Sequence, residues 1–254
     1  MQLMIAAAPR YRQAACAAGL PVANAAYRIV GGQLCALPMP PLLRGGAMLL
    51  TGAEGAFAAG TAAAVVQECR RRGYGAVLVP FSAPQLAETL AQPLHAAGIG
   101  LWIHEGCAHA VPGGRVLVST ALSGGSLEKR LRDCCRAFGP ERVVLDLQRL
   151  RMDFPLPCPS GEGVPLTGEQ LARLQTGRQV FFSRELGARY FTYRQGGATR
   201  FVLLDDADTL RRKIALGDAL GIPRGLLTLP ECGDILGAVT KQAGEQSLSG
   251  FSVT

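Results

Sequence analysis

The sequence predicts an α/β protein folded as a (β/α)8 TIM-type barrel, irregular or incomplete in places and carrying an N-terminal helix and hairpin extension. Two observations support this fold class. After residue 46, short aliphatic runs alternate with longer amphipathic runs, which is typical of βα units and a parallel sheet. The short runs are apolar throughout, as strands covered on both faces are. A chain of 254 residues is long enough for such a barrel.

Residues 1–46 are expected to pack on the barrel as the extension. They contain a predicted helix, Arg10–Ala18, and a hairpin that turns at Gly31-Gly32. The barrel is then expected to span residues 47–241, and residues 242–254 to form a flexible tail.

Eight runs are candidate strands, and six longer runs are candidate helices. Gly73, Gly98 and Gly139 come directly after helical runs, where a left-handed cap needs a residue without a Cβ. Only "GCAHAVPGGR" separates the third strand from the fourth, which is too short for a covering helix, so one strand is expected to be an excursion from the barrel. The strands are Ala47–Thr51, Ala76–Phe81, Ile99–His104, Val116–Thr120, Val143–Leu147, Val180–Ser183, Phe201–Leu204 and Gly225–Leu229. The helices are Ala58–Arg72, Gln85–Ala97, Leu127–Phe138, Gly168–Thr176, Ala207–Leu220 and Ile235–Lys241.

The charge and the apolar runs of the sequence limit the classes of partner that we expect. The net charge is +7, nearly all from arginine, and the basic clusters at residues 70–72, 129–132 and 211–213 fall on predicted helices. These helices lack the interleaved aromatic residues on which nucleic-acid bases stack. We therefore expect solvated basic faces and no nucleic acid, with a nucleic-acid binder as the minority alternative. No apolar run reaches the roughly 18 residues of a membrane span, so no membrane partner is expected.

The cysteines favour a cytoplasmic protein. Eight cysteines are scattered along the chain without CxxC spacing, and several fall on apolar helix or strand positions. The N-terminus has no basic segment ahead of its apolar residues, unlike a signal peptide. Reduced, buried thiols are therefore expected rather than disulfides.

The stretch from Ala188 to Asp234 carries a family resemblance. It holds an aromatic strand with Tyr190-Phe191-Thr192-Tyr193, a Gly-Gly turn, a second strand ending at Asp205-Asp206, and a helix with a central Lys213. A last strand led by Gly225 follows. This order resembles the closing part of the family 18 glycosidases, the chitinase-type barrels, and especially their peptidoglycan-processing relatives in spore-forming bacteria. More weakly, "VVLDLQRLRMDF" (Val143–Phe154) resembles the family's sixth-strand region, which supplies an Asp or Tyr to the sugar.

The resemblance also implies that the family's catalytic carboxylates are missing. In the family's fourth strand a terminal glutamate protonates the glycosidic oxygen, and an aspartate orients the N-acetyl group that attacks. The stretch "GYGAVLVPFS" places Gly75, Leu78 and Pro80 at the three aspartate positions and Ser82 at the glutamate. A serine hydroxyl is too weak an acid for this role. The last-strand tryptophan is also replaced, by residues 227–229, so no chitinase-type activity is expected.

Other polar residues near predicted strand ends are candidates for the site. Glu105 and Asp146 are candidate replacement acids. A glycan-binding face is expected from stacking and from hydrogen bonds to sugar hydroxyls. The alternative is a purely structural role, in which Tyr193 packs in the core and Asp146 pairs with a neighbouring arginine, Arg149 or Arg151. The expected binding residues are Tyr193, Asp146, Gln148, Asp153, Glu185 and Glu231.

The run "IHEGCAHA" raises the alternative of a metal-dependent hydrolase that uses His104 and His109. The helical zinc motif needs histidines four residues apart, and these are five apart with Gly106 between them, so no metal is expected. No cofactor is expected either, because the sequence contains neither of the common glycine-rich phosphate loops. The turn before Ser126 is open to two interpretations, an anion site or an ordinary N-cap.

Overall fold

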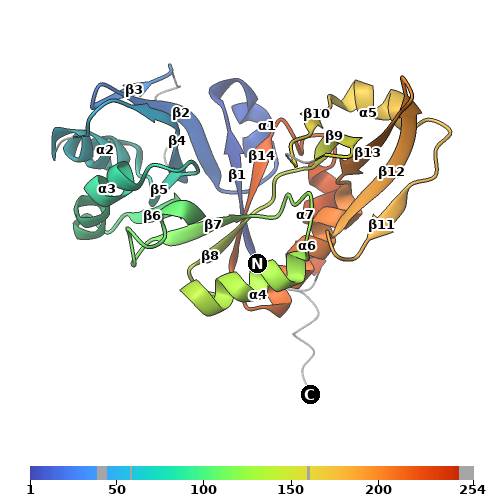
Figure 1. The fold of residues 1–254 in the computed structure, drawn as a ribbon. Helices are drawn as coiled ribbons and strands as arrows, with labels where there is room; N and C mark the ends of the chain where they lie inside the picture. The colour runs from blue at the N-terminus through green and yellow to red at the C-terminus, as the bar shows by residue number, and fades with distance from the viewer. Residues whose placement is uncertain (39–44, 58, 159–160, 246–254) are drawn as a thin grey trace.

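A computed structural model describes residues 1–38, 45–57, 59–158 and 161–245. Within them eight parallel strands close into a barrel, because β1 pairs with both β2 and β14 (Figure 1). This confirms the predicted (β/α)8 fold. The barrel strands are β1 (Gln2–Ala7), β2 (Val22–Val30), β4 (Ala47–Glu54), β5 (Ala76–Val79), β6 (Gly100–His104), β7 (Arg115–Ser119), β8 (Val143–Asp146) and β14 (Arg224–Leu229).

Helices cover the outside of the barrel between most of these strands. The predicted gap between β6 and β7 is real, because only the short 3-10 helix η2 lies there, and both of its flanking strands belong to the barrel. Ser126 caps α4 by accepting a hydrogen bond from the Lys129 backbone N–H, which supports the N-cap interpretation. The helices are η1 (Pro9–Tyr11), α1 (Arg12–Ala17), α2 (Ala59–Arg72), α3 (Pro84–Ala96), η2 (Glu105–Cys107), α4 (Leu127–Phe138), α5 (Gly168–Gln175), α6 (Ala207–Ala219) and α7 (Leu236–Glu245).

The N-terminal segment differs from the expectation. The expected helix and hairpin are present, as η1 with α1 and as β2 paired with β3 (Gln33–Ala36). However, β1 and β2 are barrel strands, so residues 1–46 supply part of the wall instead of an extension packed on it. The sequence hides these strands because alanine, depleted in strands generally, occupies many of their positions. At the other end, α7 continues to Glu245, past the expected start of the tail, and residues 246–254 lie outside the described residues.

Two predicted barrel strands belong to a separate sheet. Val180–Ser183 and Phe201–Leu204 correspond to β11 and β13, which lie in a five-stranded antiparallel sheet inserted between β8 and β14 (Figure 1). Leu203 of β13 packs on one face of this insert sheet and Val202 and Leu204 pack on the other, so the run is covered on both faces and looks like a barrel strand in the sequence. Phe181 and Phe182 of β11 are exposed. The sheet comprises β9 (Arg151–Leu156), β10 (Val164–Pro165), β11 (Phe181–Ser183), β12 (Ala188–Gln195) and β13 (Ala198–Leu204).

Counting all the barrel strands also corrects one part of the family comparison. The segment Val143–Phe154, compared above with the family's sixth strand, begins with β8, which is the seventh barrel strand in chain order. The sixth is β7. The stretch ending at Ser82 keeps its place, because β5 is the fourth barrel strand.

Apolar side chains fill the barrel interior. Along β5, Leu78 points inward, while Val77 and Val79 pack against the surrounding helices. Trp102 is the largest residue of the interior cluster, and alanines on β1, β2, β4 and β5 leave room for it. The remaining members are Ala6, Ala23, Ala47, Leu49, Ala76, Leu117, Val144 and Leu226. Polar groups are therefore concentrated at the two ends of the barrel.

A buried ion pair ties the insert sheet to the barrel. Lys213 on α6 and Asp205 at the end of β13 are each 1% exposed, and their Nζ and Oδ2 atoms are 2.7 Å apart. The same Oδ2 accepts a hydrogen bond from the backbone N–H of Leu150, in the segment that leaves β8. Asp206 begins α6 with a capping box that includes Thr209. One carboxylate thus fixes the insert sheet, its helix and the chain leaving the barrel.

Lys213→Met is expected to lower the free energy of unfolding by about 3–5 kcal/mol, because it leaves the carboxylate of Asp205 buried without a counter-charge. Lys129→Met is the matched control. Its ammonium lies 2.7 Å from Asp133 but is exposed, so its loss is expected to cost less than about 1 kcal/mol. Urea unfolding of both variants measures the difference. Equal losses would contradict the role given to the buried pair.

Candidate functional site

A cavity of about 350 Å³ opens at the carboxyl ends of the barrel strands, the end at which barrel enzymes bind their substrates. Its walls are mostly small or apolar. Four side chains with polar groups line it: Asp146 at the end of β8, Gln148 just beyond, Thr228 on β14 and Glu231 after it. The remaining lining residues are Ala6, Ala7, Ala8, Ala25, Leu49, Pro80, Leu226 and Leu229. We call this the mouth cavity.

The stretch Pro80–Ser82 lies where the sequence predicts it. It follows β5 directly, and Pro80 lines the mouth cavity. Ser82 is exposed and lies beside Gly106, which follows β6. A Cβ built on Gly106 would be 3.5 Å from the hydroxyl oxygen of Ser82. Pro80, Phe81 and Ser82 supply no side chain that ionises near neutral pH.

Asp146 is the most perturbed carboxyl group of the mouth cavity. Burial raises its pKa to about 6, and the nearby charge of Glu231 acts in the same direction. The hydrogen bond that it accepts from Gln148, 2.7 Å from Nε2 to Oδ2, opposes that shift. Desolvation in the cavity also raises the pKa of Glu231. The mouth cavity therefore contains two carboxyl groups that are both easier to protonate than in water.

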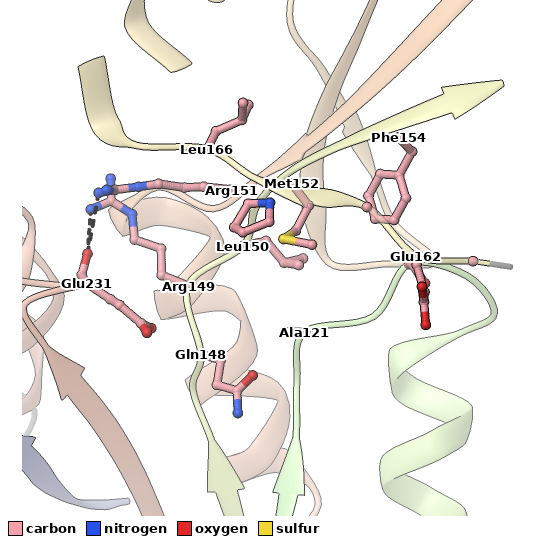
Figure 2. Close-up of a pocket in the computed structure, with 14 residues that line it drawn as sticks. Ala121, Gln148, Arg149, Leu150, Arg151, Met152, Phe154, Glu162, Leu166 and Glu231 are labelled. Carbon is pink, nitrogen blue, oxygen red and sulfur yellow. Dashed lines mark hydrogen bonds between the residues drawn. The ribbon is translucent and has the colours of Figure 1, made fainter. Parts of the chain in front are cut away.

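A second, larger cavity of about 630 Å³ adjoins the mouth cavity, because Gln148 and Glu231 line both. It lies between the chain leaving β8 and the insert sheet, and we call it the insert groove. Figure 2 shows Arg149 and Arg151 directed toward Glu231. Arg149 donates to its backbone carbonyl at 2.9 Å and Arg151 at 3.4 Å, and both guanidinium groups also contact Asp234.

These arginines do not pair with Asp146, so the structural alternative predicted for that residue is wrong. They hold the backbone after β14 instead, which keeps the side chain of Glu231 beside both cavities. From the sequence, Arg149 and Arg151 were expected only as ion-pair partners of Asp146. The usable signal was their position just after the seventh strand, where barrel proteins place binding residues.

Tyr193 and Asp153 lie together, but away from the two cavities. Both belong to the insert sheet, and the Tyr193 hydroxyl donates to Asp153 Oδ2 at 2.8 Å. Arg200 donates to the same oxygen at 2.8 Å, and Asp153 is 5% exposed. The Tyr193 ring packs at the edge of a small apolar cluster that includes Phe191. Neither side chain lines the mouth cavity or the insert groove.

Glu105 and Glu185 are also separate from these cavities. Glu105 begins η2 and pairs with Arg130, whose Nη2 lies 2.6 Å from its Oε1. Glu185 is exposed in the turn between β11 and β12, and its backbone carbonyl accepts a hydrogen bond from the N–H of Leu127. Of the sequence-predicted set, Asp146, Gln148 and Glu231 come together at the mouth cavity, and Tyr193 and Asp153 pair elsewhere, on the insert sheet.

The two histidines considered as metal ligands have other contacts. The Nδ1 atom of His104 accepts a hydrogen bond from the Gly106 backbone at 3.0 Å, and the His109 ring meets Phe138 edge to face. Among the described residues, no three His, Cys, Asp or Glu side chains gather closely enough to hold a metal ion. The metal-dependent alternative therefore has no ligand cluster in the described part of the chain.

Comparison with known proteins identifies the fold. No family model matches the sequence, and no curated protein matches it. Solved structures do match. The Bacillus megaterium spore cortex-lytic enzyme SleL has a TM-score of 0.63 and 13% identity, covering 93% of this chain and 73% of that one. A family 18 N-acetylglucosaminidase from Paenibacillus barengoltzii has a TM-score of 0.65 and 13% identity, over 94% and 98%. A family 18 chitinase from Cycas revoluta in complex with (GlcNAc)4 has a TM-score of 0.63 and 13% identity, over 97% and 100%.

The fold is that of the family 18 glycoside hydrolases. Each of these matches spans more than nine tenths of this chain, so the insert sheet falls within the shared family 18 architecture. At these identities the likeness defines the fold alone.

Asp146→Asn is expected to stabilise this family 18-like barrel above pH 6 and to have little effect near pH 4. The folded pKa of about 6 exceeds the value of about 3.9 in an unfolded chain. The folded state therefore binds more protons between these values, and stability falls as the pH rises from about 4 to 6. Removing the carboxylate relieves this penalty, which is at most about 3 kcal/mol at pH 7.5.

Urea unfolding at pH 4.5 and 7.5 measures the effect. Asp133→Asn serves as the control of opposite sign, because the hydrogen bond from Lys129 lowers the pKa of Asp133 and its charge stabilises the folded state at pH 7.5. If Asp146→Asn destabilised the protein equally at both pH values, Asp146 would not have the environment described.

Proposed function

We propose that this barrel binds a glycan in the mouth cavity and the adjoining insert groove, without chitinase-type hydrolysis. A sugar chain needs a long site with groups that bind hydroxyls. The two cavities adjoin at Gln148 and Glu231, so we propose that one ligand extends over both at the substrate end of the barrel. Carboxylate, amide and guanidinium groups line it, and each can hydrogen-bond to hydroxyl groups.

The residues at the end of β5 support the second part of the proposal, the absence of chitinase-type hydrolysis. There the chain presents Pro80, Phe81 and Ser82, where the family resemblance expects the catalytic acid. General acid catalysis contributes about 10²–10⁴-fold to a hydrolytic rate, and none of these side chains can supply it. The interior position below, Leu78, is fully buried and apolar, so it adds no carboxylate.

The ligand class is supported by the structural neighbours. One is a chitinase in complex with (GlcNAc)4, and another is a spore cortex-lytic enzyme. For this chain we therefore propose glycans with N-acetylglucosamine units, either chitin-like or peptidoglycan-like. All eight cysteines of the chain are free thiols, which supports our proposal of a reducing, cytoplasmic location. No described helix is long and apolar enough to span a membrane.

Chito-oligosaccharides or muropeptides are expected to bind with a dissociation constant on the order of 10 μM to 1 mM, as a few polar contacts usually allow. Gln148→Ala is expected to weaken binding about tenfold, because it removes an amide shared by both cavities. Tyr193→Phe is the control. It removes a hydroxyl bonded to Asp153 outside the site and is expected to leave the affinity unchanged.

Isothermal titration calorimetry of the three proteins makes the comparison. If no glycan gives a measurable heat of binding with the wild type, the proposed function is wrong. A loss of affinity in the tyrosine variant, with none in the glutamine variant, would move the site to the insert sheet.

A diverged hydrolase is the second candidate, and Asp146 favours it. A carboxyl group with a pKa of about 6 is partly protonated near neutral pH, which suits a general acid. Glu231 lines the same cavity and would be the second carboxylate that glycoside hydrolysis requires. This candidate keeps the glycan site and adds catalysis through residues other than those on β5.

Chromogenic N-acetylglucosamine oligomers separate the two candidates. For a binding protein, no release of the leaving group above the uncatalysed rate is expected from the wild type. Turnover that Asp146→Asn abolishes, with Glu105→Gln still active, would establish the diverged hydrolase. Glu105 is a matched control because its carboxylate pairs with Arg130 away from the mouth cavity.

A further inference from the structure

A third cavity lies at the opposite, amino-terminal end of the barrel. Its volume is about 530 Å³, and it is lined where β6, β7, β8 and β14 begin. Its charged side chains are Arg115, Arg142, Arg224 and Glu141, so arginine dominates. Apolar walls come from Ile99, Leu101, Val111 and Pro112. We call this the basal cavity.

Arg115 and Arg224 occupy inward positions of the barrel wall. On β7, Arg115 is two residues before the interior Leu117, and on β14, Arg224 is two residues before the interior Leu226. Side chains alternate along a strand, so both arginines point to the inner side of the barrel. Gly100 leaves room for one of them, since a Cβ there would lie 3.3 Å from Arg115 Nη1.

Neither guanidinium forms an ion pair in the part of the chain that the structure describes. The side chains of Arg115 and Arg224 make no hydrogen bond with the described residues, although Glu141 lines the same cavity. Arg142, by contrast, donates to the backbone carbonyls of Gly114 at 2.9 Å and of Val111 at 3.4 Å. Arg115 is half-buried, and burial together with the charge of Arg224 lowers its pKa.

Stability does not explain this pair. The amino-terminal end of a TIM barrel usually serves folding, not chemistry. Two like charges that are partly withdrawn from water repel each other and lose hydration, so they reduce the stability of the fold. The interior layer just above them is apolar and needs no cation. An anion bound near the two guanidinium groups would offset this cost.

We propose that the basal cavity binds a small organic molecule carrying a phosphate or carboxylate group. Guanidinium groups bind both oxyanions through paired N–H donors. The apolar wall would contact the body of the molecule, and the volume falls in the usual range for small-molecule sites. This site is independent of the glycan site at the other end of the barrel.

Calorimetric titration with glucose 6-phosphate, citrate and uncharged glucose tests the proposal and separates phosphate from carboxylate ligands. At least one anion is expected to bind at a ratio of one per chain, and glucose is not. Arg115→Gln and Arg224→Gln are each expected to weaken binding at least tenfold. Arg194→Gln is the matched control, because it removes an exposed positive charge on β12 and is expected to change the affinity less than twofold.

Thermal unfolding gives a second readout that a merely structural arginine would not produce. Without added anion, Arg115→Gln is expected to raise the melting temperature, because it relieves the repulsion. With saturating anion the wild type should melt higher than the variant. Arg115→Lys, which keeps the charge but lacks the planar fork, tests the site if the glutamine variant does not fold.

The proposal is overturned if neither anion binds the wild type at 10 mM. It is also overturned if Arg194→Gln weakens binding as much as Arg115→Gln does, because the anions would then respond only to net charge. A melting temperature that falls in Arg115→Gln without any effect on anion binding would make the arginine structural.

Discussion

The buried pair between Lys213 and Asp205 is the contact on which the candidate site depends. The carboxylate binds the lysine of α6 and the backbone of Leu150, while the backbone carbonyl of Asp205 accepts a hydrogen bond from Arg149 at 3.0 Å. Arg149 then holds the backbone of Glu231. A chain of direct contacts therefore runs from the core of the insert to a carboxylate of the mouth cavity. Because removing one partner of a buried pair costs several kcal/mol, this chain keeps a defined geometry.

The apolar interior of the barrel imposes the second constraint. With Leu78 and Trp102 filling the centre, no polar side chain of the interior cluster connects the two ends. The polar chemistry divides accordingly, with the carboxyl groups of Asp146 and Glu231 at the mouth and the guanidinium groups at the base. The two ends can therefore bind ligands of different chemistry without sharing a residue.

The sequence predicted those features that depend on local chemistry. The helix Leu127–Phe138 and the place of Pro80–Ser82 follow from caps, periodicity and the end of an apolar run. The strands β1 and β2 were missed because alanine gives no strand signal, although the barrel needs small residues facing Trp102. The site was predicted in part for a similar reason. Asp146 and Glu231 line one cavity because β8 and β14 are hydrogen-bonded neighbours, in which Asp146 pairs with Leu226, 80 residues later in the chain. No local pattern encodes that pairing.

The two ends share a physical property that the fold itself does not require. At the mouth, two carboxyl groups with raised pKa values line one cavity. At the base, two arginine side chains form no ion pair with the described residues. Each arrangement costs folding free energy, and apolar replacements of similar size would remove that cost. The rest of the wall shows that such replacements fit, since Leu78 and Leu226 occupy equivalent interior positions. The unfavourable charged groups lie at both ends of the barrel, and none lies in the apolar interior between them. This is the pattern expected of binding sites built on a stable barrel.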